Sequence, residues 1–368
     1  MKNDEELIKE VNKCSRCTLC LSVCPVYQAQ KDEAKSAKGF LNIIYVFLTK
    51  KIKPDKKVDL KCLNCNKCQS FCPSNINLVD VLSGFKHNFK TSKYNPFLLQ
   101  IKWCFFSFIL KMYRVLKLNH FLKNSFLQTL SYQNVKIDKN LKKTSKNKKV
   151  VFFEGCFNRY INQNSKNSII NLLSKNGYQI VVPNFGCCNI NSYFEGDFNG
   201  FEKSWKNKLK KIAKDTDFVL FDCDTCLKSF KIYVDKFDKN LSLKALSFAE
   251  FANQAGLKIV ENKKIKNIIY HKPCQSDNIC ENILKTQIQN LKDIENFEKC
   301  CGFGSLLGFE NFELCKKIAK NKFNSVQINS GDTIVTSCNL CKIGLLLGLQ
   351  ENNIDNGAKV INISELFL

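Results

Sequence analysis

Eight of the 21 cysteines of this chain fall into two runs with identical spacing. Each run reads C-x2-C-x2-C-x3-C-P. The first run consists of Cys14, Cys17, Cys20 and Cys24, and the second run consists of Cys62, Cys65, Cys68 and Cys72. This spacing is the bacterial ferredoxin signature, in which cysteine thiolates hold 4Fe-4S clusters. The two runs therefore predict two such clusters and one-electron chemistry.

In two-cluster ferredoxins the fourth cysteine of each run binds the other cluster. We therefore expect one cluster to be bound by Cys14, Cys17, Cys20 and Cys72, and the other by Cys62, Cys65, Cys68 and Cys24. The alternatives are inert buried cysteines or a zinc site. Structural zinc sites normally use paired C-x2-C ligands rather than this triple step, so the spacing favours the clusters.

A different cysteine pattern occurs twice in the C-terminal part of the chain. In each copy a single cysteine is followed by an adjacent pair and then by a C-x2-C. The first cysteine set is Cys156, Cys187, Cys188, Cys223 and Cys226, and the second cysteine set is Cys274, Cys300, Cys301, Cys338 and Cys341. Five thiolates exceed the four that a cubane cluster or a zinc ion needs. Each set therefore predicts a further iron-sulfur cluster of unusual type, a zinc site, or a redox-active thiol beside a metal centre.

The residues around the two cysteine sets alternate between predicted strands and helices. Short apolar stretches predict strands at residues 150–153, 178–182, 217–221, 265–270 and 333–336. The same order of strand and cysteine occurs in both halves, which indicates a duplicated α/β unit. Ligands bind at the carboxyl ends of the strands in open α/β sheets. We therefore expect each cysteine set to gather at that edge of its sheet.

The N-terminal residues have helical patterns instead, and we expect helices at residues 1–13, 40–48 and 76–89. The predicted fold class is an all-helical two-cluster ferredoxin domain followed by two tandem α/β cysteine-rich repeats. The predicted boundaries are 1–95 for the ferredoxin-type domain, 96–149 for an apolar helix and a lysine-rich linker, 150–240 for the first repeat, and 241–368 for the second repeat with a connecting amphipathic helix at 241–256.

The most apolar stretch of the chain, Phe97–Leu110, is 14 residues long and contains Lys102. A membrane-spanning helix needs about 20 apolar residues, so we do not expect a transmembrane segment here. Two interpretations stay open. This helix packs on its own protein, or it lies in a membrane interface or contacts a membrane partner.

The formal net charge is +24, and nearly all of the positive charge comes from lysine. The arginines are Arg16, Arg114 and Arg159, whereas base readout in nucleic acids favours arginine. The main interpretation is a surface of solvated lysines, and the alternative is weak attraction to an anionic membrane surface. A metal-dependent nucleic-acid protein is a third interpretation, for which we expect no binding even at low salt.

No paired catalytic carboxylates, Ser/His/Asp pattern, phosphate-binding glycine loop or dinucleotide fingerprint is apparent in the sequence. We therefore assign no catalytic residue and expect any hydride chemistry to occur on a partner. His271, three residues before Cys274, is a candidate metal ligand, a hydrogen-bond donor to a cluster thiolate, or a structural histidine. Cys104, Cys280 and Cys315 lie outside the motifs and are expected to be small buried hydrophobes.

These motifs together resemble one family. The chain is similar to the iron-sulfur subunits of the glycolate oxidase, lactate-utilisation and anaerobic glycerol-3-phosphate dehydrogenase group. The duplicated cysteine sets resemble the CCG domains of heterodisulfide reductase. The resemblance is carried by Phe153–Cys156, His271–Cys274, Cys300–Gly304 and Ser36–Gly39. The last segment departs at two positions from the Ser-Pro-Arg-Gly of the family, and Asn189 stands where the family usually has glycine after the first cysteine pair.

The resemblance implies an iron-sulfur electron-transfer subunit of a flavin-linked dehydrogenase complex. A partner subunit containing FAD would oxidise a 2-hydroxy acid such as glycolate or lactate, or glycerol 3-phosphate. A quinone or a similar membrane carrier would accept the electrons. The alternative is a heterodisulfide reductase-like oxidoreductase, in which the cysteine sets cleave a disulfide.

The beginning of the sequence, Met1–Glu6, is acidic and has no apolar signal core. Cysteines used for metal ligation fit a reducing compartment. We therefore expect a cytoplasmic protein. The implied membrane acceptor adds the expectation that the complex lies peripherally on the inner face of the cytoplasmic membrane.

Overall fold

The computed structural model describes most of the chain outside its central segment. The described residues are 3–54, 58, 60–92, 94, 95, 98, 101, 148–260, 267–294, 297, 299–324, 326–354 and 357–367. The predicted apolar helix Phe97–Leu110 lies outside them except for Leu98 and Ile101, and most of the predicted linker lies outside them as well.

The described part of residues 3–92 folds into helices. These are α1 (Asp4–Asn12), α2 (Leu19–Val23), α3 (Pro25–Gln30), the 3-10 helix η1 (Glu33–Lys35), α4 (Ala37–Thr49), α5 (Lys67–Ser70) and α6 (Leu78–Phe89). Helix α4 begins where the Ser36 hydroxyl accepts a hydrogen bond from the Gly39 N–H at 3.1 Å. Its apolar face, with Phe40 and Ile44, packs in one buried cluster with Leu7 of α1 and Phe85 of α6. The predicted helices at 1–13, 40–48 and 76–89 are confirmed.

Two parallel four-stranded sheets follow, and they have the same topology. The first sheet has the order β2-β1-β3-β4 and the second has the order β6-β5-β7-β8. The strands of the first sheet are β1 (Lys149–Phe153), β2 (Gln179–Val181), β3 (Phe218–Phe221) and β4 (Ala245–Ser247). Those of the second are β5 (Asn267–His271), β6 (Leu291–Lys292), β7 (Asp332–Thr336) and β8 (Lys359–Asn362). The predicted duplication of an α/β unit is confirmed. Strands β4, β6 and β8 were not predicted individually.

Helices connect the strands of each sheet. The first repeat contains α9 (Gly155–Tyr160), α10 (Gln163–Lys175), α11 (Ile190–Phe194), α12 (Phe198–Leu209), α13 (Asp224–Phe237), α14 (Lys239–Leu243) and α15 (Phe248–Gln254). The second repeat contains α16 (Ile279–Gln287), α17 (Leu307–Glu310), α18 (Phe312–Phe323), α19 (Asn339–Glu351) and the 3-10 helix η3 (Ile363–Phe367). None of the described helices is long and apolar enough to cross a membrane.

The single helix predicted at residues 241–256 is wrong. Helices α14 and α15 flank strand β4, which pairs in parallel with β3 so that Val219 lies opposite Ala245. Helix α15 begins with a capping box in which the Ser247 hydroxyl accepts from the Glu250 N–H and the Glu250 carboxylate accepts from the Ser247 N–H. The amphipathic pattern reports only on neighbouring residues. Residues 245–247 form a strand instead, because they pair with the distant strand β3.

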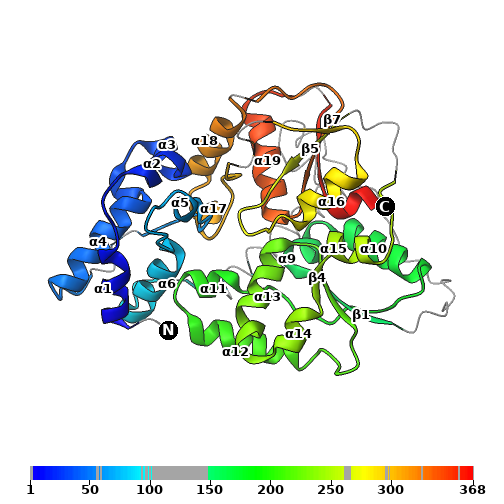
Figure 1. Cartoon of the computed structure of the whole chain (residues 1–368), viewed down its shortest axis with the longest axis horizontal. Helices are drawn as coiled ribbons and strands as arrows, with labels where there is room; N and C mark the ends of the chain where they lie inside the picture. The colour runs from blue at the N-terminus through cyan, green and yellow to red at the C-terminus, as the bar shows by residue number, and fades with distance from the viewer. Residues whose placement is uncertain are drawn as a thin grey trace.

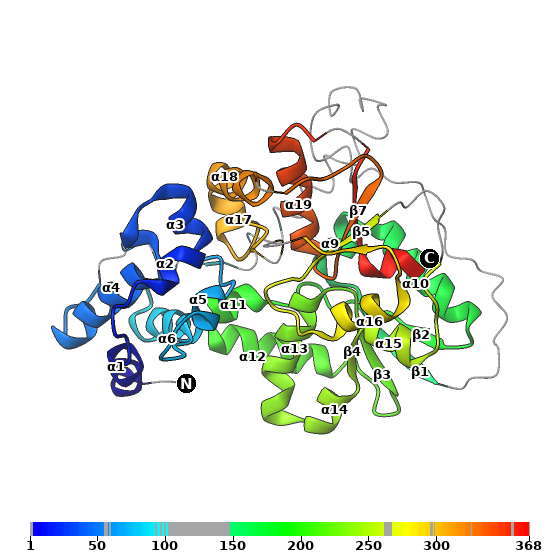
Figure 2. The same ribbon diagram turned by 45° about the horizontal axis from the view of Figure 1, so that its top comes forward.

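The N-terminal helices lie on one side of the molecule and contact both repeats (Figures 1 and 2). Helix α6 packs on α11 of the first repeat, and α3 packs on α18 of the second. Val26 and Leu63 from the N-terminal part share a buried apolar cluster with Leu314 and Ile318 of α18. The start of the second run is therefore fixed against the second repeat.

Candidate metal centres

The loops of the two cysteine runs share an unusual backbone conformation. Arg16 and Asn64, the residues before the second cysteine of each run, have φ values of 58° and 51°. The residues after that cysteine, Thr18 and Asn66, have φ values of 69° and 56°. Left-handed residues of this kind turn backbone N–H groups inward and form concavities that bind anions. In the second run the Asn64 N–H donates to the Cys62 Sγ at 3.3 Å, as expected of a loop that wraps a cluster.

The eight cysteines gather in two neighbouring groups. Four of them, Cys14, Cys17, Cys20 and Cys72, line one cavity together with Cys68. Burial raises the pKa of Cys62, and nearby Cys65, Cys68 and Cys24 raise it further. The structure thus places Cys72 near Cys14, Cys17 and Cys20, and Cys24 near Cys62 and Cys68, and the exchanged ligand pattern stays a prediction.

Cys65 of the second run also reaches the second repeat. The sulfur atoms of Cys65, Cys274 and Cys300 all lie within 4.8 Å of one another. The Cys274 thiol lowers the pKa of Cys65, but the Cys300 thiol and burial raise it, and the result is a pKa of about 12. Sequence spacing alone did not place these three residues together, because they lie on segments far apart in the chain.

The first cysteine set converges beyond the carboxyl ends of the strands in the first sheet. Cys156 lies on α9 after β1, the adjacent pair follows β2, and Cys223 and Cys226 follow β3 at the start of α13. The thiols of Cys156 and then Cys188 lower the pKa of Cys187, while the Cys187 thiol and burial raise the pKa of Cys188 to about 12. These opposed shifts show thiols close enough to compete for protons.

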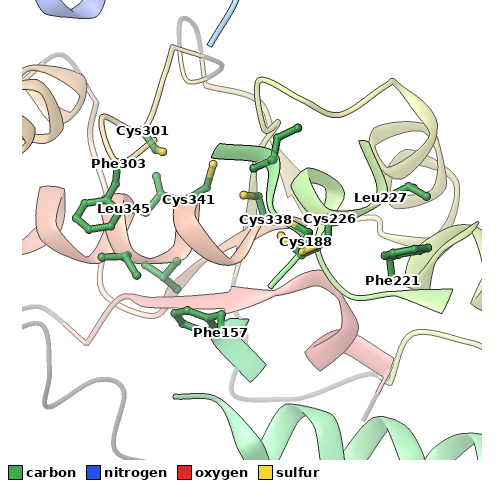
Figure 3. Packing of buried hydrophobic residues seen from close by; sticks show 14 of the residues in the cluster. Phe157, Cys188, Phe221, Cys226, Leu227, Cys301, Phe303, Cys338, Cys341 and Leu345 are labelled. Carbon is green, nitrogen blue, oxygen red and sulfur yellow. The ribbon is translucent and has the colours of Figure 1, made fainter. Parts of the chain in front are cut away.

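The second set has the corresponding arrangement and meets the first set at one point. Neighbouring Cys223 and then Cys341 lower the pKa of Cys338, so thiols of the two sets are adjacent. The Cys338 sulfur also lies 3.2 Å from the Thr225 hydroxyl of the first repeat. Figure 3 shows Cys301 and Cys341 with their sulfur atoms facing each other, and Cys338 beside Cys226 and Cys188. All ten cysteines of the two sets, with Cys65, line a single cavity of about 100 Å³.

The turn after each cysteine pair is left-handed in both repeats. Gly302 has φ 83° and Asn189 has φ 57°. Asparagine tolerates this region better than most residues that carry a Cβ. The Asn189 N–H lies 3.5 Å from the Cys187 Sγ and donates to it. The first repeat therefore keeps the tight turn although it lacks the glycine of the family.

Two buried lysines accompany the cysteine sets, and sequence analysis missed them. Lys208 of α12 and Lys322 of α18 are 6% and 4% exposed. Burial lowers the pKa of both lysines, to about 8 for Lys322. Nearby thiols oppose this shift: those of the first set raise the pKa of Lys208, and those of the second set raise the pKa of Lys322. The available signal was positional, because these lysines follow the cysteine pairs by 20 and 21 residues. Each lysine places a positive charge where a thiolate-bound anionic centre needs one.

Two of the three cysteines outside the motifs lie in apolar surroundings. Cys280 is buried with its sulfur 3.9 Å from the Ser247 hydroxyl, and the buried Cys315 lies 3.7 Å from the Leu307 carbonyl oxygen. Cys104 lies outside the described residues. The chemistry of the remaining donors fits iron-sulfur clusters, because most of these clustered thiols are buried or half-buried and have anion-binding loops and buried lysines nearby.

Comparison with protein families agrees with this donor chemistry. A model of the 4Fe-4S dicluster domain matches residues 10–76, and a model of the cysteine-rich (CCG) domain matches residues 150–231 and 268–345. Both matches cover the cysteine motifs described above. They indicate iron-sulfur clusters in this chain.

Similar proteins include oxidoreductase subunits from bacteria and archaea. The probable glycolate oxidase iron-sulfur subunit of Bacillus subtilis is 22% identical, over 98% of this chain and 94% of that protein. The glycolate oxidase iron-sulfur subunit of Escherichia coli is 22% identical, over 88% of this chain and 87% of that protein. A subunit of the dihydromethanophenazine:CoB–CoM heterodisulfide reductase of Methanosarcina acetivorans is 21% identical, over 93% of this chain and 90% of that protein.

The resemblance inferred from the sequence motifs is thereby confirmed. The relatives are subunits of oxidoreductase complexes, which supports a role for this chain as a component of such a complex. The chain therefore combines a 4Fe-4S dicluster domain with two cysteine-rich CCG domains, and over most of its length it is similar to glycolate oxidase iron-sulfur subunits.

Proposed function

We propose that this protein is the iron-sulfur electron-transfer subunit of a flavin-linked dehydrogenase complex. The dehydrogenase partner contains FAD and oxidises a 2-hydroxy acid of the glycolate or lactate type, or glycerol 3-phosphate. A quinone or a similar carrier accepts the electrons. The complex lies peripherally on the cytoplasmic face of the membrane.

The observation that carries this proposal is the continuity of thiols across the molecule. Cys65 of the second run lies within 4.8 Å of Cys274 and Cys300 of the second set. At the other end of that set, Cys338 interacts with Cys223 of the first set. A chain whose metal-ligand groups touch from one module to the next is suited to moving electrons over its length.

In this proposal the two runs hold two 4Fe-4S clusters in an all-helical module, with the exchanged ligands given above, and the ten cysteines of the two sets hold further centres. Bound iron-sulfur clusters supply one-electron transfer. The protein holds the thiolates in place, excludes water with the apolar cluster around Val26 and Leu63, and balances negative charge with Lys208 and Lys322.

An anaerobic affinity purification from the native host tests the proposal. We expect a flavoprotein to copurify, and we expect the complex to reduce a dye with glycolate, lactate or glycerol 3-phosphate. The matched control is the isolated iron-sulfur chain, which we expect to be inert with each substrate. A cluster-loaded chain that never associates with a flavoprotein would contradict the proposal.

A second candidate function is a heterodisulfide reductase-like activity. The cavity lined by both cysteine sets favours it, because a disulfide bound there would meet thiol-held centres on two sides. The reaction would consume two electrons and two protons for each disulfide cleaved and release two thiols. Disulfide turnover by the isolated chain with a one-electron donor would favour this candidate over the first.

A further inference from the structure

His271 is a buried histidine at the end of strand β5, and one ring nitrogen faces the second cysteine set. Its side chain is fully buried. A ring nitrogen of His271 and the sulfur atoms of Cys301 and Cys341 all lie within 4.8 Å of one another. Nε2 has no hydrogen-bond partner among the residues that the structure describes. A buried nitrogen left unpaired in this way is costly unless something at the site binds it.

The other ring nitrogen fixes the tautomer. Nδ1 lies 3.1 Å from the carbonyl oxygen of Phe297, and a carbonyl oxygen only accepts, so Nδ1 carries the proton. The Lys322 ammonium donates to the same oxygen and to that of Lys299. With the proton on Nδ1, Nε2 carries the lone pair, and it is the ring nitrogen that can bind a metal beside Cys301 and Cys341.

This arrangement is the one that metal-binding histidines use. Such histidines donate their second ring N–H to a carbonyl or carboxylate, which orients the ring and raises its basicity. Iron and zinc both accept imidazole nitrogen together with cysteine thiolate in proteins. We propose that Nε2 of His271 is a metal ligand of the second cysteine set, which gives this centre a mixed nitrogen and sulfur donor set.

The first cysteine set has no matching nitrogen. Phe153 ends strand β1 three residues before Cys156, as His271 ends β5 three residues before Cys274. The Phe153 ring packs on Phe185 and Phe221, with ring centroids 5.1 Å apart in both pairs. The two centres are thus chemically different although their cysteines correspond. Because the type of ligand sets the reduction potential of an iron-sulfur centre, we expect the two centres to have different potentials.

The test uses the full chain loaded with its metals and labelled with ¹⁵N-histidine. The chain contains three histidines, so few ring nitrogens contribute. In a paramagnetic state of the centre, pulsed EPR should show a directly bonded nitrogen whose pattern changes from ¹⁴N to ¹⁵N on labelling. In a diamagnetic state, NMR should give the Nε2 chemical shift of a metal-bound imidazole. Metal analysis distinguishes iron from zinc.

Two variants and one control assign the signal. His271→Phe introduces the residue type that the first repeat has at the corresponding position, Phe153. His271→Gln retains a group that can hydrogen-bond to the Phe297 carbonyl. Both should abolish the bonded-nitrogen signal and shift the potential of an iron centre. His87→Gln, which alters a histidine at the contact with Gly196, should leave both unchanged. A bonded-nitrogen signal that is absent from the native protein, or that persists in both variants, overturns the inference.

The inference rests on the proposed metal-binding role of the second set. Measuring the metal content shows whether that role fails or only the inference about His271 fails. If the variant Cys274→Ser/Cys338→Ser holds as much metal as the native protein, the set binds none, and the proposed role fails together with the inference. If this variant loses metal but the native protein shows no bonded nitrogen, only the inference about His271 fails.

Discussion

At the scale of single residues, the chemistry depends on which sulfur atoms become ligands. Cys68 lies near Cys62, Cys65 and Cys24, and buried Cys280 lies apart, near Ser247. Burial raises the pKa of Cys68 strongly, and neighbouring Cys65 and Cys24 raise it further. A thiol of this kind is held as thiolate only by a bound metal, so it should matter to the cluster and to the fold together.

We expect Cys68→Ser to lose the iron of one cluster and to lower the thermal stability of the N-terminal module, because metal binding contributes folding free energy. Iron analysis, the visible spectrum and a thermal melt measure the effect. Cys280→Ser is the matched control and should retain its iron. Full iron content in Cys68→Ser would show that Cys68 is not a ligand.

At the scale of elements, helix α6 is tied to the first repeat through the α11–α12 connection. The Lys86 ammonium lies 2.8 Å from the Glu195 carboxylate, and both side chains are largely buried. The Ser92 hydroxyl donates to the same carboxylate at 2.7 Å, and His87 Nδ1 donates to the Gly196 carbonyl at 2.7 Å. This contact fixes how the N-terminal module sits on the first repeat.

We expect Lys86→Met to lower the free energy of unfolding by about 3 kcal/mol, because it leaves the Glu195 carboxylate buried without its partner charge. Denaturant unfolding of the metal-loaded protein measures the change. The double variant Lys86→Met/Glu195→Gln removes both charges and should recover part of the loss. A double variant less stable than Lys86→Met would contradict the ion-pair explanation.

A second contact between elements positions the second cysteine set. Helix α19 carries Cys341, and Gly344 lets it approach the Cys300–Cys301 loop closely. A Cβ atom at Gly344 would lie 2.5 Å from the Cys301 carbonyl oxygen, a distance that requires backbone movement. Glycine is therefore required at this position by contact rather than by conformation.

We expect Gly344→Ala to separate the cysteine pair from Cys341 and to reduce the metal content of the second set while the dicluster domain keeps its iron. Metal analysis, together with EPR of the reduced protein, distinguishes metal loss from the second set from iron loss in the dicluster domain. Gly308→Ala is the control, because the atoms nearest to its Cβ would be those of the Phe303 side chain, at 3.3 Å or more. Equal metal loss in both variants would indicate a general folding defect.

At the scale of the whole molecule, the second run is seated on the second repeat by buried polar contacts. The Asn64 side-chain amide donates to the Ser305 hydroxyl at 2.8 Å, and the Gln275 amide donates to the Asn64 carbonyl at 2.7 Å. These bonds hold the loop that carries Cys65 against Cys274 and Cys300. They set the distance between the dicluster domain and the second cysteine set.

We expect Gln275→Leu/Ser305→Ala to slow electron exchange between these two parts while the iron content stays unchanged. The lost hydrogen bonds contribute about 1 kcal/mol each, which loosens the contact without unfolding it. Stopped-flow oxidation of the reduced protein, followed at the cluster absorbance, measures the rate. Gln289→Leu, at an exposed position of the second repeat, is the control. An unchanged rate in the double variant would contradict a route through Cys65.

The sequence by itself determined the cysteine motifs, the two modules and the duplication. The spacing of Cys62–Cys72 is a property of one short segment, so it can be recognised in the sequence. The same holds for strands such as 150–153, which are followed within a few residues by a cysteine. Only the tertiary structure decided that Cys65 meets Cys274 and that Cys338 meets Cys223. It also replaced a predicted helix by strand β4.

The physical reason is that these features depend on contacts between distant segments. The position of His271 before Cys274 left three interpretations open in the sequence, and that of Lys322 indicated none. Only the folded chain shows that both side chains are buried and that the His271 ring lies near the thiols of Cys301 and Cys341. Residues 245–247 became a strand because β3 offered unpaired backbone groups, which no local periodicity reports. Spacing therefore specified the donors, and packing between the modules specified which donors meet.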